Sequence, residues 1–270
     1  MYGNGQGVPR DYAEASKWFR KAADQGHSKA QVHLGLMYDN GHGVPQDYAE
    51  AARMYRKLAE QGLDLGQYKL GIMHYNGQGV PQDYVEAMKW YRKAADQGNV
   101  YAQNNLGVMY SNGEGAPQDF AEAMEWYRKA ADQGNASAQN NLGVMYGNGE
   151  GVPKDFAEAM KWYRKAAEQG NADAMYNLGV MFDSGQGISQ NRVLAHMWFN
   201  LAASRYPASK QESREDAIRS RDKTANKMTA GQIAQAQKLA REWKLRNGRE
   251  TAESGTGRPS GTPPLIRRGK

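Results

Sequence analysis

The sequence contains no cysteine and no long apolar run among its 270 residues. Without cysteine, a disulfide framework, a thiolate metal site and a cysteine nucleophile are all excluded. No stretch approaches the roughly 18 consecutive apolar residues that a membrane-spanning helix needs. Residues 1–5 form neither a basic nor an apolar segment, so the start does not resemble a signal peptide. With 31 glycines, the chain is instead glycine-rich and mostly globular in composition.

Positive charge is scarce in the first three quarters of the chain. Residues 1–199 hold 19 Lys/Arg and 22 Asp/Glu, whereas residues 200–270 hold 16 and 7, so the net charge of +6 comes from the C-terminal quarter. Such a region is typical of a solvated helix face followed by a charged tail. Contact with an acidic protein, a nucleic acid or an anionic membrane is the alternative. Apart from Tyr206, at its start, Trp243 is the only aromatic residue there, which argues against stacking on single-stranded nucleic acid.

Proline is also rare, but its few positions are regular. It recurs every 36 residues, and glycine and tryptophan columns keep the same step. Residues 104–139 and 140–175 are identical at 29 of 36 positions. A fixed period of this length is the signature of a repeat architecture. The prolines in step are Pro9, Pro45, Pro81, Pro117 and Pro153.

Each repeat carries two helical patterns. Ala102, Leu106 and Met109 share one helix face, and a second apolar stripe follows Asp119. Asp119 is a good N-cap, and Gly134 is placed to end the second helix in the left-handed region. An Asn-Gly-x-Gly-x-Pro turn joins the two helices. Since one such hairpin cannot bury enough surface alone, the hairpins must stack into a solenoid.

One glycine column falls inside the first helix of every repeat, where glycine costs about 1 kcal/mol relative to alanine. Gly143 is an example. We expect two helix backbones to approach there too closely for a Cβ atom.

These columns resemble the Sel-1-like repeat family, a relative of the tetratricopeptide repeat. The resemblance covers residues 1 to about 204 and implies an all-α, right-handed superhelix closed by a C-terminal helical cap. One copy of the family pattern consists of Ala138, Leu142, Gly143, Tyr146, Gly149, Gly151, Val152, Asp155, Ala159, Trp162, Tyr163, Ala166, Ala167 and Gly170.

The repeat columns also predict domain boundaries. Two capping boxes are expected in the cap, at Ser209–Glu212 and at Thr229–Gln232. Because Met1 aligns with Met37, the chain starts inside a repeat, and we expect a missing first helix and any signal peptide to lie upstream. The predicted parts are an incomplete repeat at 1–27, complete repeats at 28–63, 64–99, 100–135, 136–171 and 172–204, capping helices at 205–246 and a disordered basic tail at 247–270.

Candidate catalytic and metal motifs are few. Ser220 and Lys223 match the S-x-x-K motif of serine β-lactamases, but no S-D-N or K-T-G motif accompanies them, and the segment reads as an exposed basic helix. The five histidines have no spacing typical of a metal site, and His74 reads as a substitute for the tyrosine of its column. We therefore expect no catalytic residue, no metal and no cofactor.

The resemblance implies that the first helix of each repeat lines a concave surface that binds a peptide or protein. The chain is then a monomeric, non-enzymatic interaction scaffold of the bacterial envelope or of signalling, periplasmic or secreted. Alternatives are a β-lactam-binding or peptidoglycan-related envelope enzyme, and nucleic-acid or membrane attachment through residues 205–270. The residues expected to contact the partner are His33, Tyr68, Lys69, Tyr101, Asn104, Asn105, Asn140, Asn141, Tyr176 and Asn177.

Overall fold

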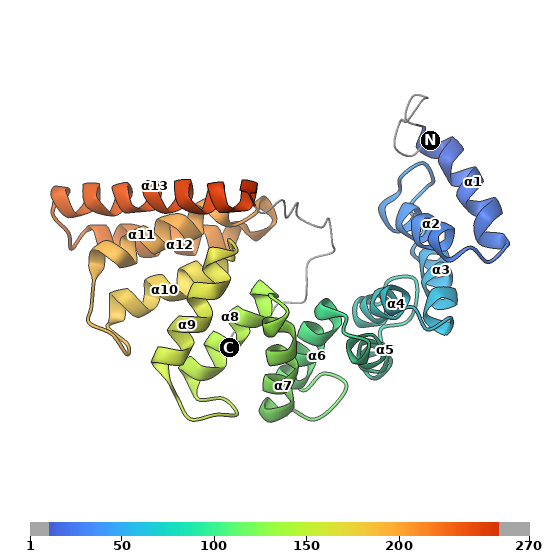
Figure 1. The fold of residues 1–270 in the computed structure, drawn as a ribbon, viewed down its shortest axis with the longest axis horizontal. Coiled ribbons are helices and arrows are strands. Elements are labelled where there is room, and N and C mark those ends of the chain that lie inside the picture. The colour runs from blue at the N-terminus through green and yellow to red at the C-terminus, as the bar shows by residue number, and fades with distance from the viewer. Residues whose placement is uncertain (1–10, 254–270) are drawn as a thin grey trace. The chain divides into compact units, whose positions relative to one another are not determined.

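Residues 11–253, the part of the chain described by this computed structural model, fold into helices joined by short turns (Figure 1). The chain divides into two compact units, with the boundary between Trp126 and Tyr127. In both units consecutive helices pack against each other in pairs. The all-helical repeat fold predicted from the sequence is therefore confirmed.

In the N-terminal unit each helix has 13 residues, and each of the first five packs on the helix that follows it. Even-numbered helices are the first of each repeat and are called A helices below, and odd-numbered ones are called B helices. The helices of this unit are α1 (Tyr12–Asp24), α2 (Ser28–Asn40), α3 (Tyr48–Glu60), α4 (Asp64–Asn76), α5 (Tyr84–Asp96) and α6 (Val100–Asn112), and α7 (Phe120–Asp132) extends across the boundary.

The C-terminal unit continues the alternation and then departs from it. After α10 the helices become longer, and α11 packs against both of the helices that follow it. The helices of this unit are α8 (Ala136–Asn148), α9 (Phe156–Glu168), α10 (Ala172–Ser184), α11 (Arg192–Arg205), the short 3-10 helix η1 (Ala208–Lys210), α12 (Gln211–Ala225) and α13 (Ala230–Glu253).

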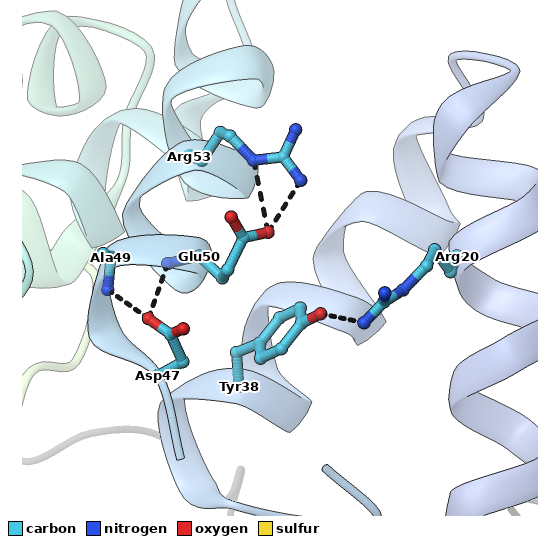
Figure 2. A network of polar contacts seen from close by, with 6 residues as sticks. All are labelled: Arg20, Tyr38, Asp47, Ala49, Glu50 and Arg53. Carbon is cyan, nitrogen blue, oxygen red and sulfur yellow. Dashed lines mark hydrogen bonds and ion pairs between the residues drawn. The ribbon is translucent and has the colours of Figure 1, made fainter. Parts of the chain in front are cut away.

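Helix ends follow the local sequence. The Asp47 carboxylate accepts hydrogen bonds from the backbone amides of Ala49 and Glu50, both at 3.0 Å, at the start of α3 (Figure 2). Asp119 caps α7 in the same way, as predicted. Gly134 follows α7 with φ +88°, which also confirms the sequence prediction.

In α2, α4, α8 and α10 the glycine inside the A helix faces an aromatic ring of the B helix that follows. A Cβ atom on Gly143 would lie 2.5 Å from Cε1 of Tyr163. The expectation of a backbone neighbour is therefore wrong, because it is a side-chain ring that needs the space. The same pairing occurs at Gly35 with Tyr55, Gly71 with Tyr91 and Gly179 with Phe199.

The second glycine of the turn joins neighbouring repeats. A Cβ atom on Gly79 would lie 2.1 Å from the carbonyl oxygen of Tyr48, at the start of the preceding B helix. Gly79 also has φ +70°, a conformation that side chains disfavour. The turn thus needs glycine for both its backbone conformation and its contact.

A column of buried glutamines links the repeats in a way that the sequence analysis did not anticipate. The Gln139 amide donates to the carbonyl oxygen of Ala131 at 3.1 Å, and Gln169 donates to the Gln139 side chain at 2.8 Å. The corresponding pair in the other unit is Gln67 and Gln97, at 2.7 Å. These bonds satisfy helix-end carbonyl groups at the junction between repeats.

The last helices differ in detail from the predicted cap. Thr229 and Gln232 form the expected reciprocal capping box at 2.9 and 3.3 Å. The box expected at Ser209 is wrong, since residues 208–210 form a 3-10 turn after Pro207 and α12 starts at Gln211 without a side-chain cap. Helix α13 buries Ala236, Ala240 and Trp243 and leaves Gln237 exposed.

The predicted start of the disordered tail, residue 247, lies too early in the sequence. Helix α13 continues to Glu253, and the buried side chain of Asn247 donates to the carbonyl oxygen of Glu168 at 3.2 Å. That bond anchors α13 to the end of α9, so the helix continues through a sequence whose composition suggested a coil. The remainder of the predicted tail, residues 254–270, lies outside the described residues.

Candidate functional site

The ten residues predicted to contact a partner all lie on A helices, but half of their side chains are buried. The expectation that these columns face solvent is wrong at those positions, because an A helix packs against helices on more than one side. His33 is exposed, and the other four residues are partly exposed. The buried ones are Tyr68, Lys69, Asn104, Asn105 and Asn141.

In the N-terminal unit the structure brings two of the predicted tyrosines together. The ring of Tyr68 lies 5.9 Å from that of Tyr101 and 6.0 Å from that of Tyr91. The Tyr68 hydroxyl is buried and has no hydrogen-bond partner among the described residues. Burial therefore raises the pKa of Tyr68, and the adjacent Tyr101 adds to the effect. A buried hydroxyl without a partner is a group that a ligand can satisfy.

Lys69 and His33 occupy the same column but have different surroundings. The Lys69 ammonium group lies 3.7 Å from the Asp39 carboxylate, and the pKa of Lys69 is lowered by burial in spite of this charge. His33 stacks on Phe19 of α1, with ring centroids 4.8 Å apart. The column therefore presents a histidine, then a lysine, and an asparagine in each of the next three repeats.

In the C-terminal unit the predicted residues make two separate polar contacts. The amide of Asn177 donates to the Asn140 side chain at 3.0 Å. The Tyr176 hydroxyl lies 3.4 Å from the Ser220 hydroxyl, and its ring lies 5.4 Å from that of Phe199. Ser220 of the S-x-x-K motif is thus partly buried against α10, whereas Lys223 is exposed.

A second polar pattern, which the sequence analysis missed, links three of the B helices to the next repeat. The guanidinium of Arg20 donates to the Tyr38 hydroxyl (Figure 2). The pair is repeated 72 and 108 residues later, as Arg92 with Tyr110 and as Arg128 with Tyr146, the latter at 2.7 Å. The constant spacing of 18 residues between donor and acceptor was the sequence signal that could have revealed it.

Arg92 shows the full set of contacts that this arginine column can make. Besides donating to Tyr110, its guanidinium lies 4.7 Å from the ring centroid of Trp126. It also lies 3.9 Å from the Glu122 carboxylate. A hydroxyl, an indole face and a carboxylate thus surround one guanidinium.

The pattern breaks at Arg164, whose partner positions lie in the last repeat. The tyrosine position is occupied by Phe182 and the glutamate position by Leu194, while Trp198 keeps the tryptophan position. A groove of about 490 Å³ opens at this place, between α9, α10, α11 and α13. It is the second candidate site, and its formation depends on α13, which lies far along the chain.

Other kinds of site are not supported within residues 11–253. No group of three or more His, Asp or Glu side chains there is arranged to hold a metal ion. Within the same range, no helix combines the length and apolar character needed to cross a bilayer.

Comparison with known proteins matches the same repeats. A family model of the Sel1 repeat matches residues 1–27, 28–63, 64–99, 100–135, 136–171 and 172–206. No curated protein sequence matches the chain.

Solved structures provide several similar proteins. A Sel1 repeat protein from Oxalobacter formigenes is 40% identical, with a TM-score of 0.69 over 76% of this chain and 84% of that one. The protective antigen c5321 of uropathogenic Escherichia coli, which displays an SLR fold, is 30% identical over 97% of this chain and 71% of its own, with a TM-score of 0.45. The immunity protein Pa5087 of Pseudomonas aeruginosa is 24% identical over 73% and 75%, with a TM-score of 0.49. Six matched repeats and a 40% identical relative show that the chain belongs to the Sel1 repeat family.

Proposed function

We propose that this protein is a non-enzymatic scaffold that binds a protein or peptide partner on the exposed parts of its A helices. Sel1 repeats generally mediate protein–protein interaction, which supports the general class. Sel1 proteins are often periplasmic or secreted, and we extend the proposal to a role in the bacterial envelope.

The observation that carries the proposal is the aromatic pair on α4 and α6. Tyr101 is partly exposed, and beside it the buried Tyr68 hydroxyl has no partner among the described residues. When the adjacent Tyr101 ring shifts on binding, a peptide backbone carbonyl or amide can reach that hydroxyl, while an apolar side chain of the partner covers Tyr101. In the C-terminal unit Asn140, Tyr176 and Asn177 offer equivalent partly exposed polar groups.

Photo-crosslinking tests the location of the partner. A benzoylphenylalanine placed at Tyr101 should crosslink to one protein partner in cells, because it lies on the proposed surface. The matched control is the same amino acid at Val85, which is 63% exposed on the B helix α5. An identical crosslinking pattern from both positions, or crosslinking from Val85 alone, would contradict the proposal.

Replacing Tyr68 by phenylalanine separates stability from binding. Since the hydroxyl is buried without a partner, its removal should raise the free energy of unfolding by about 1 kcal/mol. Binding of the identified partner should weaken at the same time, because the hydroxyl is the group proposed to meet it. Urea unfolding and calorimetric titration measure the two effects, and unchanged binding with raised stability would remove Tyr68 from the site.

A further inference from the structure

The groove between the last two repeats and α13 holds the Arg164 guanidinium, and apolar side chains stand at the positions of the acceptors that Arg92 has. Arg92, in the equivalent position two repeats earlier, meets the Tyr110 hydroxyl and the Glu122 carboxylate. Arg164 meets Phe182 and Leu194 at the corresponding positions and makes no hydrogen bond or ion pair within residues 11–253. Phe182 and Leu194 both lack the acceptor that the residue at the same position of the earlier repeat provides. Together they leave Arg164 without an acceptor.

The groove has the size and lining of a small ligand site. Its volume of about 490 Å³ lies within the roughly 300–1,000 Å³ range of such sites. Its apolar wall contains Phe182, Leu194, Trp198 and Trp243, with the two indole rings 5.7 Å apart in an edge-on arrangement. These side chains come from α10, α11 and α13, whose mutual packing fixes the wall.

Positively and negatively charged side chains both lie beside this apolar wall. Arg164 and Arg246 supply two guanidinium groups, and Arg246, like Arg164, has no ion pair or hydrogen bond among the described residues. Glu168 and Glu242 supply carboxylates, and the Glu242 carboxylate lies 3.9 Å from the Lys238 ammonium group. A matching ligand therefore carries an anionic group, N–H donors and an apolar part close together.

We propose that this groove binds the C-terminus of a peptide whose last side chain is apolar, with the terminal carboxylate on Arg164 and the side chain against Trp198 and Trp243. A planar guanidinium pairs with a carboxylate through two parallel hydrogen bonds. The two glutamates accept from the peptide N–H groups. The carboxylate takes the place that Glu122 occupies beside Arg92.

This site is separate from the A-helix surface of the proposed function. None of the residues that line the groove is among the ten residues predicted for that surface. The two proposals can therefore fail independently of each other.

The test compares two synthetic peptides on the full-length protein by calorimetric titration. Acetyl-Ala-Leu with a free carboxylate should bind at least about ten-fold more tightly than the same peptide with a C-terminal amide. Arg164→Gln should reduce the ratio of the two affinities, acid over amide, to about one, because it removes the guanidinium that binds the carboxylate. Indole N–H shifts assigned to Trp198 and Trp243 should report binding in the groove.

Two further variants keep the proposal falsifiable if Arg164→Gln unfolds. Leu194→Glu restores the carboxylate of the earlier repeats, so it should weaken binding of the free-acid peptide while leaving the helical circular dichroism unchanged. Arg128→Gln makes the same charge change in the same column outside the groove and should leave the acid-to-amide ratio unchanged. Equal affinities for the two peptides, no binding of the acid at millimolar concentrations, or an unchanged ratio in Arg164→Gln would overturn the proposal.

Discussion

At the residue scale, one glycine and the ring opposite it set the distance between the two helices of a repeat. In α8, a Cβ atom on Gly143 would lie 2.5 Å from the Tyr163 ring, whereas one on Gly147 would lie 3.8 Å from its nearest neighbours. Gly143→Ala should therefore lower the free energy of unfolding by about 1–3 kcal/mol through overpacking.

The matched variant Gly147→Ala should change the free energy of unfolding in the opposite direction. It removes a glycine from the same helix without a close contact, so a gain of about 0.5 kcal/mol is expected. Chemical unfolding of both variants measures the difference. Similar effects of the two substitutions would show that the ring does not limit the space.

The histidine in the tyrosine column gives a pH-dependent prediction at the same scale. Burial lowers the pKa of His74 below its ordinary value of 6.5, and the nearby Arg56 lowers it further, while Glu86 and Asp83 oppose the shift. The folded state favours the neutral ring, so His74 does not reduce the free energy of unfolding above pH 6.5. As the pH falls from 6.5 toward the lowered pKa, the unfolded state binds a proton more readily than the folded state, and the free energy of unfolding decreases.

His74→Tyr removes this titration and restores an acceptor for Arg56, by analogy with Arg20 and Tyr38. The variant should be more stable than the parent by about 1 kcal/mol at pH 8, and the difference should grow at pH 5. His196 titrates in both proteins, so its contribution cancels in the comparison. A difference that shrinks on acidification would contradict the assignment.

At the element scale, the glutamine column holds one helix pair to the next. Gln139 satisfies the Ala131 carbonyl and accepts from Gln169. The last repeat has Met175 in this column, which makes methionine the natural replacement. Gln139→Met should cost about 1–2 kcal/mol, because it leaves a helix-end carbonyl and an amide without partners. Urea unfolding measures the loss, and a neutral result would show that water replaces the glutamine.

The sequence predicts helices and their ends well because their causes are local. Asp119 and Gly134 each act within one turn of chain, so the residue type and its place in the repeat suffice. The burial of Tyr68 and Asn104 could not be predicted in this way. A helix that packs on more than one neighbour exposes only a narrow stripe, and its position depends on helix packing.

The groove at Arg164 is harder still to predict, because it depends on contacts between residues that are far apart in the sequence. The exchanges to Phe182 and Leu194 are visible in the repeat columns. Phe182 and Leu194 become the wall of a groove only because α13 packs beside them, where Asn247 donates to the carbonyl oxygen of Glu168. The contact joins residues 79 positions apart, and repeat periodicity carries no information about it.

At the scale of the whole molecule, the C-terminal helices should stabilise the last repeat. Deleting residues 211–270 removes α12 and α13 and uncovers Trp198, so a loss of at least about 3 kcal/mol is expected. Deleting residues 254–270 alone should leave the unfolding transition unchanged, because the composition of that segment predicts no contribution to a core. Equal effects of the two deletions would contradict the capping role of α12 and α13.

The central claim is that the A helices bind a partner while the B helices support them. Hydrogen–deuterium exchange of the full chain, with and without the partner identified by crosslinking, tests it most directly. Added protection is expected in α2, α4, α6, α8 and α10, and unchanged exchange in α3, α5 and α9. Protection confined to the B helices, or no added protection in the A helices, would contradict it.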